Sequence, residues 1–213
     1  MGIDKGEEGR PGIDRKMTNE EINSLGVRSF TGPIELIQTS RQLNQVMDQI
    51  NGESVLGFDI EIRPAFRKGQ SYPPALLQLA CENKVFIIQL KAIGLPPALI
   101  DLFENPAVIK TGIAVGFDLV KLKEIKTFNE QGFVELADGA KKAGLKNFGL
   151  RGLAAVLLGF RIPKGAQKTN WSNPNLTESQ IRYAATDAWA GRELYLYMKE
   201  NNLILEPLNA SKD

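Results

Sequence analysis

The order of apolar and polar positions along the chain predicts several short strands and several amphipathic helices. Residues 55–61, VLGFDIE, are apolar until the carboxyl end and predict a central strand. The apolar runs 75–81 and 84–90 lie on either side of the turn Glu82-Asn83. These three segments together predict an antiparallel meander. A fourth strand is expected over residues 107–111.

Helical spacing is clearest after residue 39. Thr39 or Ser40 can cap a helix whose apolar positions recur until Asn51-Gly52 ends it. Residues 97–103, 116–125 and 151–158 predict further helices. The tetrapeptide at 177–180, TESQ, has the form of a capping box and predicts a helix that continues to about residue 201. Early strands followed by alternating helices and strands are typical of an α/β domain with a mixed sheet.

The two ends of the chain lack this periodicity. Residues 1–26 are polar, contain glycine and predict a mobile tail, and residues 207–213 predict a second short tail. A single folded domain is therefore expected over residues 27–206, which agrees with the ordinary length of a domain.

Charge is nearly balanced, with 26 Lys or Arg against 25 Asp or Glu. This balance excludes the strongly basic coat of proteins that package DNA without specificity. The distribution is uneven, because residues 110–168 hold eleven basic and five acidic side chains. Such a stretch is compatible with a polyanion that approaches one side of the molecule, and equally with a solvated lysine-rich face.

The single cysteine and the short apolar runs limit the kinds of metal site and of membrane association that the chain can have. Cys81 is the only cysteine, so the chain can form neither an internal disulfide nor a cysteine-rich zinc site, and its apolar surroundings predict a core position. The longest apolar run, residues 153–158, is too short to cross a bilayer, and no apolar signal segment is seen. We therefore expect a cytoplasmic protein without membrane association.

Candidate chemistry begins with the absence of histidine, which removes imidazole as a base and as a metal ligand. Asp59 and Glu61 are two residues apart on the expected strand and point to the same face. Two neighbouring carboxylates repel each other unless a cation neutralises them. For an isolated pair, a strand that simply emerges into water is the more common explanation.

Three more side chains could join this pair. Tyr183 and Asp187 are four residues apart and share one face of the expected C-terminal helix. Asp118 falls in the first turn of a helix, where the helix dipole favours an acidic residue for structural reasons alone. Each signal therefore has a structural alternative, and only their combination is specific.

The order of the three motifs FDIE, GIAVGFD and YAATDA resembles the DEDD superfamily of 3′–5′ exonucleases, and the tyrosine marks its DEDDy branch. The segment 170–191, NWSNPNLTESQIRYAATDAWAG, is similar to the third motif of Werner-type exonuclease domains and of RNase D. ALLQLACENKVFIIQL resembles the two strands after the first motif. The resemblance covers about residues 30–205 and implies an RNase H-like fold, with a five-stranded mixed sheet flanked by helices. Because the remaining residues leave no room for a helicase or a C-terminal helical domain, we expect a stand-alone nuclease domain.

The resemblance also implies roles for the five side chains. Asp59, Glu61 and Asp187 would ligate the tighter of two divalent ions, Mg²⁺ or Mn²⁺. Asp59 would bridge to the second ion, which Asp118 would hold through water. Tyr183 would orient the attacking water, and two-metal hydrolysis would release nucleoside 5′-monophosphates.

The implied partner is the 3′ end of DNA or RNA, in DNA repair or RNA processing. Possible substrate contacts lie near the first motif and in the basic stretch: Ile60, Arg63, Arg67, Lys68, Lys121, Lys123, Arg161, Lys164 and Lys168. For each basic residue in this set, a solvated side chain is the alternative. Trp171 and Trp189 are expected to pack rather than to stack on bases.

The sequence is also compatible with two other functions. The chain could be a nucleic-acid-binding scaffold on an exonuclease fold, although such proteins usually lose a metal carboxylate and none is lost here. It could also be an oligoribonuclease-like enzyme that acts on very short RNAs, which would require a closed pocket.

Overall fold

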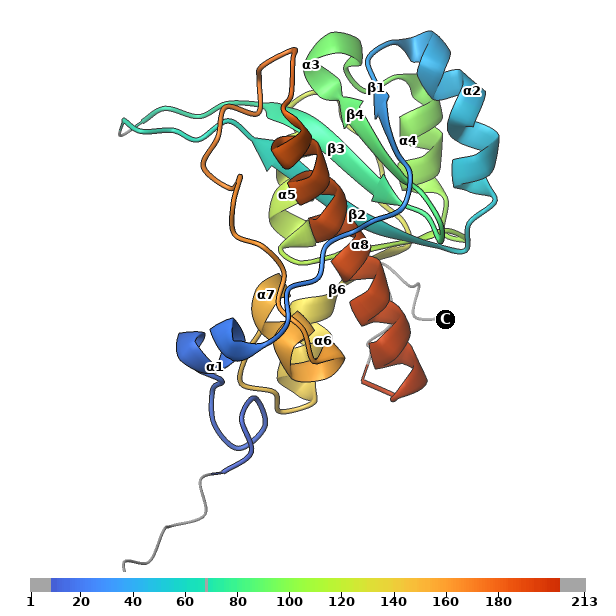
Figure 1. Ribbon diagram of the computed structural model, residues 1–213. Coiled ribbons are helices and arrows are strands. Elements are labelled where there is room, and N and C mark those ends of the chain that lie inside the picture. Colours follow the sequence, from blue (N-terminus) through green and yellow to red (C-terminus); the bar gives the residue numbers. More distant parts are fainter. Residues whose placement is uncertain (1–8, 68, 204–213) are drawn as a thin grey trace, which may run out of the picture.

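The computed structural model describes residues 9–67 and 69–203, and these form a mixed sheet with helices on both faces (Figure 1). Six strands occur in this part of the chain, in the order β1-β4-β3-β2-β5-β6. Their bounds are β1 Ile34–Ile37, β2 Val55–Ile62, β3 Pro74–Ala80, β4 Val85–Gln89, β5 Ile109–Gly112 and β6 Phe133–Glu135. The expected sheet of five strands is therefore corrected to six.

The centre of the sheet is the meander that the apolar runs predict. β2 pairs with β3, and β3 with β4, in antiparallel register. The strands β1, β5 and β6 join this meander through parallel pairs, so the sheet is mixed as expected. β1 and β6, of four and three residues, are the two strands that the hydrophobic pattern alone did not show.

Helices cover both faces of the sheet and one of its ends. Their bounds are α1 Asn19–Ser24, α2 Ser40–Asn51, α3 Leu90–Ile93, α4 Pro97–Glu104, α5 Val115–Lys123, α6 Leu136–Lys142, α7 Leu150–Leu153 and α8 Glu178–Glu200, with a π-helical turn, η1, over Ala154–Leu158. α7 and η1 together occupy the segment expected as one α-helix. Thr39 and Thr177 form the capping boxes of α2 and α8, as the sequence indicates.

Two apolar layers hold the helices against the sheet. One layer joins α2, α4 and α5 to the sheet face that carries Phe58 and Leu77. The other layer lies under α8, where Ala184 and Ala188 contact the opposite face together with Trp171. Cys81 and Trp171 are buried, and Trp189 stacks on Phe160 at 5.7 Å, so these residues pack as expected.

The alanines of α8 allow its backbone to approach β2 closely, and Gly57 completes this approach. A Cβ atom at Gly57 would lie only 1.9 Å from the carbonyl oxygen of Ala188. Because Ala188 follows Asp187 in α8 and Gly57 precedes Asp59 by two residues in β2, this contact brings the two carboxylates together.

We expect the Gly57→Ala variant to lose about 3 kcal/mol of unfolding free energy, because the added methyl group meets backbone that cannot turn aside. Gly116→Ala is the matched control, since Gly116 lies within α5 with open space around its Cβ position. That control should be neutral or slightly stabilising, as alanine is a better helix former. Urea unfolding of both variants checks the difference, and equal stability would contradict the close approach.

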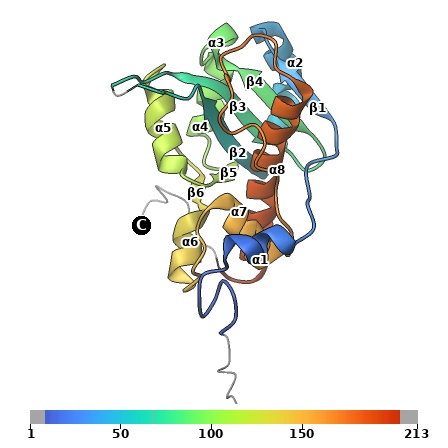
Figure 2. The ribbon, with the colours of Figure 1, turned by 60° about the vertical axis from the view of Figure 1, so that its left-hand side comes forward.

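The N-terminal segment differs from the expected tail. Residues 1–8 lie outside the described part of the chain, but residues 9–26 include α1, whose Ile22 is buried. The segment lies along α6 and α7 at one end of the sheet (Figures 1 and 2). The expected C-terminal tail, 207–213, lies outside the described residues. Within 9–67 and 69–203, no helix has the length and apolar character needed to cross a membrane.

Candidate active site

Three carboxylates from two elements meet at the sheet face below α8. Asp59 and Glu61 project from β2, and Asp187 projects from α8. One oxygen from each of these residues lies within 4.8 Å of the others. The structure therefore brings together the two motifs that lie 126 residues apart in the sequence, and it does so at the distance from which one cation can contact all three.

This arrangement costs free energy when the acids are ionised without a cation. Burial raises the pKa of Asp59 well above its usual range, and the charges of Asp187, Glu61 and Asp118 raise it further. Burial and the charges of Asp187 and Asp118 raise the pKa of Glu61 to about 9. Burial raises the pKa of Asp187 to about 7 against the hydrogen bond from Tyr183. A divalent cation would remove this repulsion, so the donor set fits a hard metal ion.

Asp118 lies beside these three carboxylates rather than among them. It is a buried residue of the first turn of α5, and its charge acts on both Asp59 and Glu61. Burial, together with the charge of Glu135, raises the pKa of Asp118 to about 8. The structure thus places the fourth acid close enough for its charge to act on the group of three, but outside that group.

Glu135 is a fifth acid that the sequence motifs do not include. It ends β6, and its carboxylate accepts hydrogen bonds from the backbone of Val115 at 2.8 Å and of Ala137 at 3.0 Å. The first bond ties the start of α5 to β6, directly after Ala114, which adopts a left-handed conformation with φ of 62°. Glu135 therefore orients the turn that presents Asp118. The sequence patterns did not show this role because they did not predict the strand β6, which Glu135 ends.

Tyr183 lies one helical turn before Asp187, on the same side of α8. Its hydroxyl is close enough to hydrogen-bond the carboxylate of Asp187. Burial raises the pKa of this phenol above its usual value, and the charge of Asp187 raises it further. Tyr183 therefore stays protonated at neutral pH and acts as a hydrogen-bond donor rather than as a base.

A hollow of about 240 Å³ opens over these groups. Asp59, Glu61, Tyr183 and Asp187 line it, together with Phe58, Ile60, Gly112, Ile113, Leu150 and Gln167. Ile60 was among the expected substrate contacts. The sequence patterns did not single out Ile113, Leu150 or Gln167, and for Gln167 the only signal was its place between the basic residues Lys164 and Lys168.

The expected phosphate contacts are placed unequally. Lys164 lines a second hollow of about 310 Å³ that also reaches Tyr183 and Asp187, so it lies near the carboxylates. Lys121 instead donates hydrogen bonds to Ser71 at 3.0 Å and Glu124 at 2.7 Å. The guanidinium of Arg63 lies 4.8 Å from the ring centre of Tyr72.

The remaining basic residues of that set that the structure describes lie outside both hollows. Arg67 and Lys168 are exposed. Arg161 donates to the carbonyl of Leu25 at 3.1 Å, and Lys123 pairs with Glu130. Lys68 lies outside the described residues. Lys164 is thus the one basic residue of the expected set that the described structure brings to the carboxylates.

One buried polar side chain under α8 stands out. Gln78 of β3 is the cross-strand partner of Asp59, and it is fully buried. Neither polar atom of its amide has a hydrogen-bond partner among the described residues. A buried amide without hydrogen-bond partners costs free energy, and buried polar side chains usually have partners. Gln78 departs from this rule next to Asp59, a candidate metal ligand.

Comparison with known proteins agrees with this geometry. Residues 34–202 match the 3′–5′ exonuclease family. The mouse bifunctional 3′–5′ exonuclease/ATP-dependent helicase WRN is 35% identical over 161 residues, which cover 73% of this chain and 11% of that protein. A 3′–5′ exonuclease of Arabidopsis thaliana is 33% identical over 78% of this chain and 61% of that protein. The chain thus spans less than two thirds of the length of these relatives.

Solved structures show the same fold. The exonuclease domain of Aedes aegypti Nibbler superposes with a TM-score of 0.73 at 21% identity, over 81% of this chain and 91% of that domain. Escherichia coli RNase D superposes with a TM-score of 0.69 at 20% identity, over 79% of this chain and 46% of that protein. These neighbours share the RNase H-like arrangement of a mixed sheet with flanking helices. By its match over residues 34–202, the chain belongs to the 3′–5′ exonuclease family.

Proposed function

We propose that this protein is a metal-dependent 3′–5′ exonuclease that hydrolyses phosphodiester bonds at the 3′ end of DNA or RNA and releases nucleoside 5′-monophosphates. The observation that carries the proposal is the meeting of Asp59, Glu61 and Asp187 within 4.8 Å in an open hollow, in a chain of this family. The fourth acid, Asp118, and the phenol of Tyr183 complete the set.

The four acids would hold two divalent cations, Mg²⁺ or Mn²⁺. Asp59, Glu61 and Asp187 would hold one ion, and Asp59 with Asp118 would hold the other. Bound at this site, the ions would lower the pKa of the attacking water and offset the charge that develops on the phosphate. The carboxylates have raised pKa values in the metal-free protein, so binding of the ions would displace protons from them.

The protein would contribute position and shape. Tyr183 would donate or share a hydrogen bond with the attacking water and hold it in line with the scissile bond, while Asp187 orients the phenol. Ile60 and Leu150 form apolar walls of the hollow, which restrict how the terminal nucleotide can lie. Holding the reacting groups in this geometry is a large part of what an enzyme of this kind supplies.

The Tyr183→Phe variant should cleave about 10–100-fold more slowly, because it loses one positioning hydrogen bond but no metal ligand. Its affinity for Mn²⁺ should remain within about twofold of the parent protein. Tyr197→Phe, on the same helix but outside the hollow, is the matched control. Single-turnover rates and Mn²⁺ titration check the two quantities, and a parental rate in Tyr183→Phe would show that the hydroxyl takes no part.

Analysis of the reaction products tests the proposed function. An unlabelled single strand incubated with the protein and Mn²⁺ should yield nucleoside 5′-monophosphates, and a chelator should stop their release. Nucleoside 3′-monophosphates or longer internal fragments would contradict the proposal, because they require a different bond or a different point of attack.

A further inference from the structure

A large hollow of the described structure lies outside the carboxylate site. It has a volume of about 700 Å³ and lies between the N-terminal segment and residues 146–152. Four cationic side chains line it, from Lys16, Lys146, Arg151 and Lys164, and no carboxylate is among its described lining residues. In a chain with a formal net charge of only +1, this is a marked concentration of positive charge.

The walls of this basic cavity are held by contacts between segments far apart in the sequence. The amide of Met17 donates to the side chain of Asn147 at 2.9 Å, and the amide of Asn147 donates back to the carbonyl of Met17 at 3.2 Å. Arg151 donates to the side chain of Asn23 at 2.5 Å. The N-terminal segment is thereby fixed against α7, so the cavity is a built feature of the fold.

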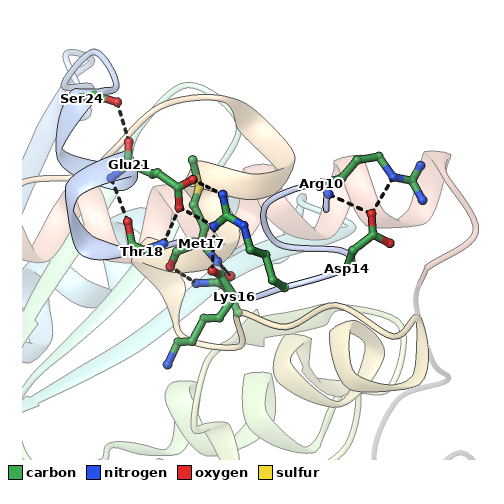
Figure 3. Close-up of polar contacts among 9 residues, drawn as sticks. Arg10, Asp14, Lys16, Met17, Thr18, Glu21 and Ser24 are labelled. Atoms are coloured by element: carbon green, nitrogen blue, oxygen red, sulfur yellow. Dashed lines mark hydrogen bonds and ion pairs between the residues drawn. The ribbon is translucent and has the colours of Figure 1, made fainter. Parts of the chain in front are cut away.

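The three lysines that line the cavity are available for a ligand. Lys16, Lys146 and Lys164 are exposed, and no ion pair is formed by their amines within the described structure. In Figure 3, Lys16 extends its amine away from Glu21, the carboxylate of which binds Arg15. Phe148, with 39% of its surface exposed, adds an aromatic ring to the same wall.

The basic cavity is continuous with the carboxylate site. The hollow of about 310 Å³ next to Tyr183 and Asp187 shares Arg151 and Lys164 with the basic cavity. It also shares Leu150 and Gln167 with the hollow over the carboxylates. The three hollows therefore form one path from the acids to the N-terminal segment.

We propose that this path is the track of a single-stranded nucleic acid, and that the basic cavity binds the phosphates of the strand on the 5′ side of the nucleotide being removed. Lysines that follow a backbone, combined with an aromatic ring for stacking, are the chemistry by which proteins hold single strands. The placement of the 5′ side rests on the proposed function, because it requires the 3′ end to lie at the carboxylates. The protein then gains affinity from strand length beyond the terminal nucleotides.

Binding of fluorescently labelled 12-mers, one DNA and one RNA, tests this inference by anisotropy. All proteins in this test carry Asp59→Asn, which prevents cleavage, and the protein with this change alone is the parent. The test variant adds Lys16→Gln and Lys146→Gln. The matched control instead adds Arg41→Gln and Lys199→Gln, at two positions exposed elsewhere on the surface. Replacement of the two lysines should weaken binding of the 12-mer about tenfold. It should also make the slope of log K against log salt less negative by about 1.4, or about 0.7 for each lost phosphate contact. The loss for a dinucleotide should be smaller, since it reaches only the carboxylate hollow.

Each outcome decides the inference. A salt slope and affinity that match those of the control pair would overturn it, as would a parent protein that binds neither 12-mer. Lysine-dependent binding in a protein whose wild-type form releases no nucleotides would support the track and contradict the proposed function. The two claims can therefore fail separately, and the ratio of DNA to RNA affinity names the polymer that the track favours.

Discussion

We expect the Asp59→Asn variant to cleave at least about a thousandfold more slowly than the wild-type protein while keeping its fold. Asp59 lies with Glu61 and Asp187 in the group of three carboxylates, and burial and the charges of Asp187, Glu61 and Asp118 raise its pKa. In the proposed arrangement Asp59 is the acid that would contact both ions. Loss of one preorganised charge of this kind costs orders of magnitude in rate.

Stability separates this effect from simple unfolding. Asparagine has nearly the same shape as aspartate, and it removes one of several carboxylates that repel one another. The metal-free variant should thus be at least as stable as the wild type. Asp101→Asn, at an exposed position of α4, is the matched control and should keep the wild-type rate. A cleavage rate in Asp59→Asn within tenfold of the wild type would contradict the assignment of the site.

The second large effect is the dependence of the free energy of unfolding on pH and on a bound divalent cation. Glu61, Asp118 and Asp187 have pKa values of about 9, 8 and 7 in the folded, metal-free protein. Their unfolded values lie near 4. Between these limits the folded protein holds more protons than the unfolded chain, so its free energy of unfolding falls as the pH rises from about 4 to about 9.

A divalent cation should reverse this loss. It binds the ionised carboxylates of the folded protein, and at a hundred times its dissociation constant it adds about 2.7 kcal/mol to the free energy of unfolding. Because protons compete with the ion, the gain should be larger at pH 8.5 than at pH 6. Thermal unfolding with Mn²⁺ or with a chelator, at a series of pH values, measures the gain directly.

The comparison with and without metal also removes the contribution of other titrating groups. Burial lowers the pKa of Lys110 to about 7, which raises stability as the pH increases from about 7 to about 10. Lys110 donates to the carbonyls of Leu102 and Asn105, away from the carboxylates, so its effect is the same in both series. A metal-induced gain that is absent at pH 8.5, or larger at pH 6, would contradict the account.

The sequence predicted the parts of this molecule that rest on local patterns. Continuous apolar runs indicated β2, β3 and β4, and the capping boxes at Thr39 and Thr177 indicated where α2 and α8 begin. The spacing of Asp59 with Glu61, and of Tyr183 with Asp187, indicated two shared faces. That these two faces meet could not follow from spacing, because it depends on the close approach of α8 to Gly57.

The features that the sequence did not show rest on long-range contacts. The strands β1 and β6 are too short for their periodicity to be distinctive. The N-terminal segment is polar, and the long-range contacts that hold it include the two hydrogen bonds between Met17 and Asn147, 130 residues apart in the chain, and the bond from Arg151 to Asn23. The polar composition of this segment therefore predicted a tail, although the segment forms a wall of the hollow of about 700 Å³.

The most direct test of the central claim is a cleavage ladder. Oligonucleotides of one sequence, as DNA and as RNA, carry a label at the 5′ end and are incubated with the wild-type protein in Mg²⁺, in Mn²⁺ or in a chelator. The account predicts labelled products that shorten one nucleotide at a time from the 3′ end, only when a divalent ion is present. Three results would each contradict it: a ladder that persists in the chelator, immediate release of the label from the 5′ end, or no cleavage of either polymer.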